Sequence, residues 1–455
     1  MELGNLLFTV AKIAVLIAYI YGLLWVLGRK KLWQRAGGTL LAFGVIQAAL
    51  LIRFGEGFEI LSAFDEGLLY QACGLAAVSI GLNLIYGLNG QFSLAQWGFC
   101  GLGAYCSADI TFRWLNGDAK GLLVVTFAVV LAGIAMLGVG RLLRRQHGVP
   151  VLSSFTFYLL AAVVGVALAL FLGRLISPLL EPLLGTVSAP GPLNSGVARQ
   201  IVFILSILLA GVFTAEVSFL FGLPVFSLGS DYFGIATLGF SIVVNVLMIN
   251  SDTILPFPEM KGARGMIGIP KLTSWAAAFA MLVLVIVAVR RLVASSTGRT
   301  IVSVREDEVA ARAMGINVPG TKLLTFVVGS LFAGVGGAVY AHYIGFLSPT
   351  TFSFLAGFNP LIVVVFGGLG SMTGTIAAAF GWVFFLEGLL RVFLSQLGTE
   401  GPTWRYVVYP ITLLLVMLLK PQGLLGTKEW GYLKPDPVAP RAAAKTSVAS
   451  VPGKG

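Results

Sequence analysis

Long apolar runs alternate with short polar segments along most of the 455-residue chain. Each run holds roughly 18–24 residues, enough to cross about 30 Å of hydrocarbon as an α-helix that rises 1.5 Å per residue. The runs lack the strict alternation over ~10 residues that a transmembrane β-barrel shows. The pattern therefore predicts an all-α, polytopic transmembrane helical bundle of about 11–13 spans. The predicted spans are residues 6–28, 37–52, 67–88, 92–112, 121–140, 151–173, 200–222, 232–250, 274–293, 322–345, 358–369, 374–394 and 406–419.

Two of these runs differ from a simple spanning helix, and a third could be mistaken for a signal peptide. Residues 92–112 are dense in small residues and contain Gln96 and Asp109, and residues 358–369 are short. Each of these two is either a full span or a re-entrant segment. Residues 6–28 are apolar over the full width of a bilayer and are followed by a basic cluster, so we expect a retained helix rather than a cleaved signal peptide.

The composition narrows the class further. Hydrophobic residues make up 57% of the chain and charged residues only 11%, with a mean hydropathy of +0.94. A soluble protein has about 45–50% apolar and about 25% charged residues. The composition thus argues against a soluble protein, a disordered chain, a disulfide scaffold and a nucleic-acid binder. The formal charge of +11 fits a polytopic protein, in which basic loops set the orientation.

Cysteine and histidine offer no chemical site. Cys73, Cys100 and Cys106 lie inside apolar stretches, and His147 and His342 lie far apart in the sequence. The sequence therefore predicts no metal, no cofactor and no catalytic residue.

The distribution of basic residues predicts the orientation. Most Lys and Arg residues fall on one side of the bundle if residues 29–35 are cytoplasmic, including those in 141–145, in 290–322 and in the tail. Because basic residues are retained in short cytoplasmic loops, we expect a multi-pass membrane protein with its N-terminus outside and its C-terminus inside.

Two segments between or beyond the spans are predicted not to cross the membrane. Residues 174–199 contain Pro178, Pro182, Pro190 and Pro192, which predicts an outside loop with at most a short interfacial helix. From about Lys434 onward the chain is rich in Pro, Ala, Lys and Ser, which predicts a disordered tail with some attraction to membrane lipid.

The longest polar connection, residues 294–321, carries a short helix signature. Glu306, Asp307 and Glu308 precede an alanine-rich stretch that includes Ala310 and Ala311, and Gly315 ends it. One interpretation is a solvated linker helix. The other is a docking helix, whose small apolar face would enter a groove on a partner. That face consists of Val309, Ala310, Ala313 and Met314.

This connection and four further segments closely resemble a known family. The stretch that begins at Gly298 resembles the cytoplasmic EAA-type loop and following helix of the LivM-type permease subunits of bacterial branched-chain amino acid ABC importers. It reads GRTIVSVREDEVAARAMGINVPGTKLLTFVVGSLFAGVGGAVYAHYIGFLSPTTFSF. Four other segments match the same family in the same order, so the signal is more specific than any one motif. They are GLNLIYGLNGQFSLAQWGFCGLGAY at 81–105, SDYFGIATLGF at 230–240, GGLGSMTG at 367–374 and KPQGLLG at 420–426.

The resemblance implies a permease fold of the branched-chain amino acid and ribose type and an ATP-driven importer in the bacterial inner membrane. This chain would form half of the path, beside a second homologous permease subunit, two ABC ATPase subunits and a periplasmic substrate-binding protein that delivers the amino acid. The coupling helix that receives the ATPase movement would include Glu306, Asp307, Glu308, Ala310, Ala311 and Gly315. The chain has no G-x-x-x-x-G-K-[ST] loop, which also places ATP hydrolysis on separate subunits.

The match is not uniform along the chain. We expect residues 1–66 to be an N-terminal extension with two helices, residues 67–426 to be the permease core, and residues 427–455 to be the tail. Within the core, residues 121–199 resemble an insertion. The outside loop PFPEMKGARGMIGIP keeps only the Gly-x-x-Gly-Ile-Pro end of the family pattern.

Polar residues near Gly87 and Gly90 are the leading candidates for the translocation path. Broken helices at membrane depth are tolerated where they are buried in protein or line a wet cavity. The alternative is that these side chains join neighbouring helices by hydrogen bonds. The candidates are Asn83, Asn89, Gln91, Ser93 and Gln96, together with Tyr232, Thr237 and Asn245 on the next motif span.

Glycines and isolated charges complete the set of unusual intramembrane residues. Gly334, Gly336 and Gly337 are interpreted as packing positions that let helices approach closely. Glu216 stands deep in an apolar span and is a functional candidate, whereas Glu387 and Arg391 have the i, i+4 spacing of an ion pair.

The sequence therefore predicts a permease subunit of an ABC importer for branched-chain or related hydrophobic amino acids. An ion-gradient-driven secondary transporter is the alternative, but it would need paired buried charges on several spans. A membrane enzyme would need a clustered acid, base, nucleophile or metal set, and none is visible.

Overall fold

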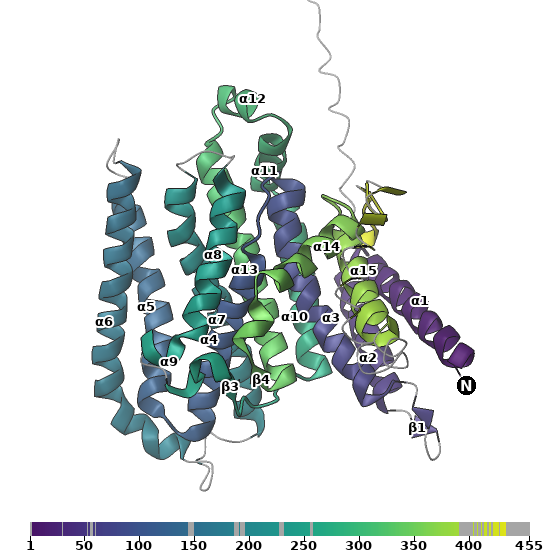
Figure 1. The fold of residues 1–455 in the computed structure, drawn as a ribbon, viewed down its shortest axis with the longest axis horizontal. Coiled ribbons are helices and arrows are strands. Elements are labelled where there is room, and N and C mark those ends of the chain that lie inside the picture. Colours follow the sequence, from purple (N-terminus) through teal and green to yellow (C-terminus); the bar gives the residue numbers. More distant parts are fainter. Residues whose placement is uncertain are drawn as a thin grey trace, which may run out of the picture.

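A computed structural model describes most of the chain. The described residues are 2–29, 31–51, 53–54, 58–59, 61–143, 150–185, 191, 196–226, 232–254, 258–390, 404, 407, 411, 414–415, 418–419, 422–426 and 428–433. These residues form a helical bundle with two very short β-ladders (Figure 1). The predicted span at 406–419 and the predicted tail at 427–455 lie largely outside the described residues.

Ten helices of 17 residues or more form the body of the described bundle. They are α1 (Glu2–Leu27), α2 (Leu32–Leu51), α3 (Ala63–Leu82), α4 (Gln96–Asn116), α5 (Ala119–Leu143), α6 (Val151–Leu184), α7 (Gly196–Val225), α8 (Phe233–Ile249), α10 (Trp275–Ala294) and α13 (Val318–Ile344). Shorter helices connect them: α9 (Ser251–Ile254), α11 (Ser296–Glu306), α12 (Glu308–Ala313), α14 (Phe358–Gly367) and α15 (Met372–Val383).

Wider and tighter helical turns extend these elements. The π-helices η1 (Asn83–Leu88) and η8 (Phe384–Leu390) continue α3 and α15. The 3-10 turns are η4 (Pro258–Met260), η5 (Gly262–Arg264), η6 (Pro349–Phe352), η7 (Leu355–Gly357) and η10 (Gly431–Leu433). Strands β1 (Arg53–Phe54) and β2 (Phe58–Glu59) pair antiparallel, as do β3 (Met266–Ile267) and β4 (Phe346–Leu347).

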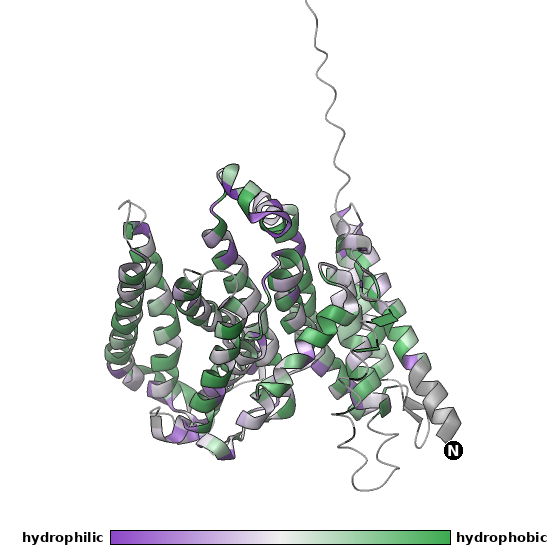
Figure 2. Ribbon diagram, turned by 45° about the horizontal axis from the view of Figure 1, so that its top comes forward, coloured by the Kyte–Doolittle hydropathy of each residue, from purple (hydrophilic) through white to green (hydrophobic). Residues whose placement is uncertain are grey.

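The helices have the length and composition of membrane spans, which confirms the predicted polytopic bundle. Among the described residues, six helices are long and apolar enough to cross a bilayer: Ala63–Leu88, Ala119–Leu143, Leu152–Leu184, Gly196–Val225, Trp275–Ala294 and Val318–Ile344. Four shorter apolar helices accompany them. Polar residues gather toward the ends of the bundle, with apolar stretches along the helices between (Figure 2).

Helix α13 occupies the centre of the bundle and packs against α3, α4 and α7. Its glycines make this possible on three sides. A Cβ atom at Gly334 would lie 2.2 Å from a threonine hydroxyl of α7, one at Gly336 would lie 2.5 Å from a carbonyl oxygen of α3, and one at Gly337 would lie 1.9 Å from a carbonyl oxygen of α4. No side chain fits at such distances, so the contacts support the packing interpretation of these glycines.

Two peripheral helix pairs flank this centre on opposite sides (Figure 1). Helices α5 and α6 form a hairpin that contacts α7, whereas α1 packs against α2, α15 and η10. Lys12 of α1 also reaches the start of α3, where its Nζ lies 2.7 Å from Asp65 Oδ2. A partly buried ion pair therefore ties α1 to α3.

Two predictions about boundaries were wrong. The segment 174–199 was predicted to be a loop, but its described residues are mainly helical, because α6 continues through Pro178 and Pro182 to Leu184 and α7 begins at Gly196. Apolar surroundings favour this outcome, since leaving the helix would expose unpaired backbone groups to hydrocarbon. The short helix predicted to run from the acids at 306–308 to Gly315 is divided, because α11 ends at Glu306 and α12 begins at Glu308.

Candidate functional site

The connection between α10 and α13 is built from three separately capped helices. Ser295, Asp307 and Asn317 stand at the N-caps of α11, α12 and α13, and each side chain accepts a backbone N–H hydrogen bond from the first turn. Such caps satisfy donors that have no partner within the helix. Gly315 has φ +81° and lets the chain leave α12 in a left-handed conformation. Capping thus fixes a short α12 beyond the bundle (Figure 1).

Helix α12 directs one residue into the fold and leaves an apolar surface outside. Ala311 is buried in a small cluster with Val304 and Val318. Val309 and Met314 are 78% and 82% exposed. These two apolar side chains are therefore accessible to a groove on a partner.

The predicted coupling residues have distinct positions in this segment. Glu306 ends α11, and Ala310 is exposed on α12. Glu308 contacts Lys322 of α13, whose side chain is only 9% exposed. This ion pair connects α12 to the start of the central helix.

Arg305, which the sequence interpretation left out of the site, links α11 to the broken end of α3. Its Nη1 donates to the backbone oxygen of Gly87 at 2.5 Å. The same nitrogen lies 3.0 Å from where a Cβ at Gly370 would be, and the Arg305 side chain also borders Gly90. A basic residue directly before three acids was the available signal for this contact.

Asn83, at the start of η1, joins two distant parts of the chain. Its Nδ2 donates to the carbonyl oxygen of Ser371 at 2.8 Å and to Thr375 Oγ1 at 2.7 Å. Its Oδ1 accepts from the backbone N–H of Gly370 at 2.9 Å. The side chain is fully buried, so its geometry favours the helix-joining alternative over lining of the path.

The late glycine turn and the closing Pro-Gln-Gly element, recognised as separate motifs in the sequence, meet in the structure. The backbone N–H of Leu424 donates to the oxygen of Phe366 at 2.8 Å, and that of Leu425 donates to the oxygen of Gly367 at 3.2 Å. We use the name motif junction for the meeting of residues 83–96, Arg305, residues 366–375 and residues 422–426.

The segment 428–433, here called the strap, closes this junction. Glu429 accepts hydrogen bonds from the backbone N–H groups of Met372 and Thr373 at 2.7 and 2.9 Å, which caps the first turn of α15. The Trp430 N–H donates to Thr373 Oγ1 at 3.0 Å. Burial raises the pKa of the Glu429 carboxyl, against the opposing effect of the hydrogen bonds from Thr373 and Met372.

The strap also contacts the N-terminal extension. The Trp430 ring meets Tyr21 of α1 edge-on, with centroids 5.2 Å apart. Arg290 Nε of α10 donates to the backbone carbonyl oxygen of Tyr432 at 2.8 Å. The guanidinium of Arg35 on α2 lies 5.7 Å from the centroid of the Tyr432 ring. Helices α1 and α2 therefore contact the strap, which in turn closes the motif junction.

The loop between η1 and α4 is fastened to α8. The backbone N–H of Leu94 donates to Thr237 Oγ1 at 3.2 Å, and Ser241 Oγ donates to the Leu94 oxygen at 2.7 Å. Ser93 is buried and accepts from the backbone N–H of Ala95 at 3.3 Å. Thr237 thus acts as a helix-to-loop contact.

Three amides in and beside this loop are buried without a hydrogen-bond partner among the described residues. Asn89, Gln91 and Gln96 are 2%, 6% and 1% exposed, and neither side-chain polar atom of any of them is bonded. Buried polar groups are normally paired with protein or with ordered water. These amides are therefore suited to meet water or a solute.

The remaining two path candidates lie apart. Tyr232 is 63% exposed, just before α8. The Asn245 amide donates to the Pro349 oxygen at 2.7 Å near the opposite end of the bundle.

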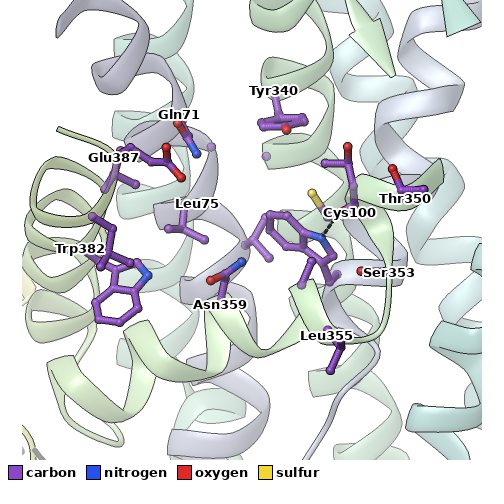
Figure 3. A pocket seen from close by; sticks show the side chains of 18 residues that line it. Gln71, Leu75, Cys100, Tyr340, Thr350, Ser353, Leu355, Asn359, Trp382 and Glu387 are labelled. Carbon is purple, nitrogen blue, oxygen red and sulfur yellow. Dashed lines mark hydrogen bonds between the residues drawn. The ribbon is translucent and has the colours of Figure 1, made fainter. Parts of the chain in front are cut away.

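A cavity of about 630 Å³ lies between α3, α4, α13 and the α14–α15 region (Figure 3). None of the eight predicted path residues lines it. Its walls combine aromatic rings with a few polar groups, a common composition for small-molecule sites. The residues of interest are Gln71, Trp97, Tyr340, Asn359, Trp382 and Glu387.

Some of these residues could have been suspected from the sequence. Asn359 lies in the short run at 358–369, and Glu387 is an intramembrane acid. Trp97 is fixed by its Nε1 donating to the Thr351 oxygen at 2.8 Å, a contact between segments far apart in the chain. Arg391, the expected partner of Glu387, lies outside the described residues.

A bundle of apolar helices with a capped helix at one end and an aromatic and polar cavity within it defines a polytopic membrane permease. The family described as "Branched-chain amino acid transport system / permease component" matches residues 145–417. The chain belongs to this family, which confirms the resemblance.

Individual relatives agree with this assignment. The chain is 30% identical over 251 residues to the high-affinity branched-chain amino acid transport system permease protein LivM of Salmonella typhimurium, covering 48% of this chain and 56% of the relative. It is 26% identical over 268 residues to a probable LivM of Methanocaldococcus jannaschii, covering 54% and 75%. LivH of Escherichia coli K12 is 34% identical over 136 residues, covering 30% and 41%.

The chain thus matches just over half the length of the first of these relatives. No solved structure matches the chain significantly. The relatives are named as permease proteins, which agrees with the prediction of a permease rather than an enzyme.

Proposed function

We propose that this chain is the transmembrane permease subunit of an ATP-driven ABC importer and forms half of the path for branched-chain or related hydrophobic amino acids. A second homologous permease would form the other half. Two ABC ATPases would bind at the α11–α12 end, and a substrate-binding protein would deliver the amino acid at the opposite end. This arrangement requires the N-terminus outside and the α11–α12 end in the cytoplasm.

The observation that carries the proposal is the exposure of α12. Val309 and Met314 project from a capped helix that the Glu308–Lys322 contact holds against α13. The exposed side chains of Val309 and Met314 on this firmly held helix are suited to enter a groove on an ATPase. The likeness to LivM-type permeases supports the same assignment.

The motif junction would carry movement from α12 into the bundle. Arg305 follows any displacement of α11 and bonds to the end of η1, and Asn83 joins η1 to the first turn of α15. Helix α3, which η1 continues, and helix α15 both line the 630 Å³ cavity, because Gln71 belongs to α3 and Trp382 to α15. A shift of the α11–α12 segment would therefore reshape this cavity, which we assign to the translocation path.

The polar candidates near the broken helix would form the cytoplasmic exit. Asn89, Gln91 and Gln96 retain free hydrogen-bonding capacity for water or a passing solute, whereas Ser93, Thr237 and Asn245 are engaged in local contacts. In the same proposal, residues 1–66 form an extension that braces the core through the strap.

The test is to co-express the chain with its candidate ATPases and second permease and to measure both ATPase retention and ATP-dependent uptake of L-leucine. The double variant Val309→Asp, Met314→Asp replaces the two exposed apolar side chains with charged ones and is expected to lose the ATPases. Ile267→Asp is the matched control, because Ile267 is 54% exposed on β3, away from α12.

Retention by the wild type and the control, with loss in the double variant, supports the proposal. Retention of the ATPases by all three proteins contradicts the docking role of α12. Uptake by the chain alone under an ion gradient, without ATPases, contradicts the importer assignment.

A further inference from the structure

A second cavity of about 400 Å³ lies beneath α12, away from the translocation cavity. Its walls come from α12, the first turns of α8 and α13, and the loop between η1 and α4. These are the segments through which α12 would transmit movement. A solute in this cavity would touch both α12 and the loop beside η1.

One wall of this cavity carries a buried amide that lacks a partner. Gln91 lines the cavity and is 6% exposed, and neither its Nε2 nor its Oε1 has a hydrogen-bond partner among the described residues. Leaving such a group unpaired costs free energy that a bound polar molecule can recover. The amide offers both a donor and an acceptor to that molecule.

The charged residues of the cavity have both signs. Arg312 and Lys322 line it together with Glu308, which contacts Lys322. A guanidinium is well suited to hold a carboxylate. A glutamate carboxylate can accept hydrogen bonds from an ammonium group. The polar half of the cavity therefore matches a zwitterion.

The rest of the wall is aromatic. Phe92, Phe226 and Phe233 line the cavity beside the polar groups. These rings suit an apolar side chain rather than a sugar or a polar amide. The volume lies near the lower end of the range of about 300–1,000 Å³ that small-molecule sites occupy.

We propose that this cavity is a cytoplasmic regulatory site for an α-amino acid with an apolar side chain. The bound amino acid holds α12 against the loop at Gln91 and slows the transport cycle. The site thus senses the accumulated product of transport. The inference rests on the proposed function for its orientation and its consequence, but the binding step can be tested without it.

The physical basis of the regulation is differential binding. An amino acid that contacts both Arg312 on α12 and Gln91 on the loop binds best to the conformation in which these two walls have their present spacing. Any conformation that moves α12 away from the loop breaks one set of contacts. Occupancy therefore favours one state of the cycle, as linkage requires.

The binding test uses the full chain in lipid nanodiscs and radiolabelled L-leucine. Gln91→Leu and Arg312→Gln are each expected to weaken binding at this site at least tenfold. Gln91→Leu should also keep or raise the Tm without leucine, because it removes an unpaired buried amide. Arg299→Gln is the matched control, because Arg299 is an exposed cation on α11 that does not line the cavity.

A further variant separates the two cavities. Trp382→Ala removes part of the wall of the 630 Å³ cavity, whereas Trp382 does not line the 400 Å³ cavity, so this variant is expected to leave the binding that Gln91→Leu removes. Absence of leucine binding to the wild type overturns the proposal. Unchanged leucine binding in Gln91→Leu and Arg312→Gln also overturns it, and so does loss of leucine binding through Trp382→Ala alone.

The regulatory step is tested in proteoliposomes that contain the complete importer. Millimolar L-leucine inside the vesicles is expected to lower the initial rate of ATP-dependent uptake several-fold. Equal concentrations of 4-methylpentanoate, which lacks the ammonium group, and 3-methylbutylamine, which lacks the carboxylate, should have a much weaker effect.

Equal inhibition by leucine and both analogues overturns the zwitterion site, and so does an uptake rate that internal leucine does not change. Failure of the proposed function is recognised separately. In that case, uptake does not depend on ATP even when the vesicles contain no amino acid.

Discussion

Arg305 and Gly87 are 218 residues apart in the chain, yet the Arg305 Nη1 donates to the Gly87 carbonyl oxygen at 2.5 Å. The contact joins the end of α11 to the π-helical end of α3. The connection that bears α12 is thereby tied to the bundle here, at the Glu308–Lys322 contact and where Ala311 is buried beside Val318. Movement of α12 must therefore break these contacts or pull on them.

Replacement of Arg305 by Gln should uncouple ATP hydrolysis from transport while the ATPases stay bound. The shorter neutral side chain cannot maintain the charge-assisted bond, and the loss of a hydrogen bond of this kind costs about 1 kcal/mol at a partly exposed site. The measurement is the ratio of leucine imported to ATP hydrolysed, which should fall several-fold. An unchanged ratio in Arg305→Gln, with Arg299→Gln as the reference, would show that the contact carries no coupling.

Asn83→Leu is expected to destabilise the junction. The substitution leaves the partly buried Gly370 N–H without its partner, whereas the Ser371 oxygen keeps the bonds that Thr375 donates. An unpaired buried group of this kind costs about 1–3 kcal/mol. Thermal unfolding in detergent should show a clearly lower Tm, whereas Asn116→Ala, which loses only an exposed bond to its own helix, should match the wild type. Equal Tm values for the two variants would contradict the joining role.

Gly337→Ala should prevent normal packing of α13 on α4. The added Cβ would lie 1.9 Å from the Cys100 oxygen, so the helices would have to separate, and overpacking of this kind costs about 1–3 kcal/mol or more. Gly239→Ala on α8 is the control, since no atom lies within 4 Å of its Cβ position. Yield of monodisperse protein and Tm are the readouts. A Gly337→Ala protein as stable as the control would disprove the close approach.

The strap should respond to pH through Glu429. Burial raises the pKa of this carboxyl above its ordinary value of 4.5, so the folded state binds a proton more readily than the unfolded state. Stability from this group is therefore present at low pH and is lost as pH rises through the raised pKa. Glu429→Gln does not titrate, and the Tm of the wild type relative to this variant should fall as pH rises. A constant or rising difference would contradict the burial of Glu429.

Much of the fold could be predicted from hydrophobic run length, because a bilayer sets the length of a spanning helix. The helix through Pro178 and Pro182 was missed because proline rules derived from water overstate the break in an apolar environment. The break between α11 and α12 at Asp307 was missed because this acid serves as an N-cap rather than as a first-turn residue.

The site was less predictable than the fold. The sequence showed the motifs but not that the glycine turn, the Pro-Gln-Gly element and Asn83 meet, since those contacts join residues nearly 300 positions apart. Trp97 and Tyr340 had no signal of their own, because an aromatic residue in a membrane helix is usually a packing residue. Glu429 stood at the start of the expected tail, and only the contact with α15 gives it a role.

The glycine contacts of α13 have a mechanical consequence. Helices that touch backbone to backbone cannot slide past one another without steric collision, so α3, α4, α7 and α13 are expected to move as one rigid body. Helices outside this body, such as α8 and the α5–α6 hairpin, then supply the compliance of the subunit. The stroke of a transport cycle would be a rotation of this four-helix block against its neighbours, with the glycines setting its stiffness.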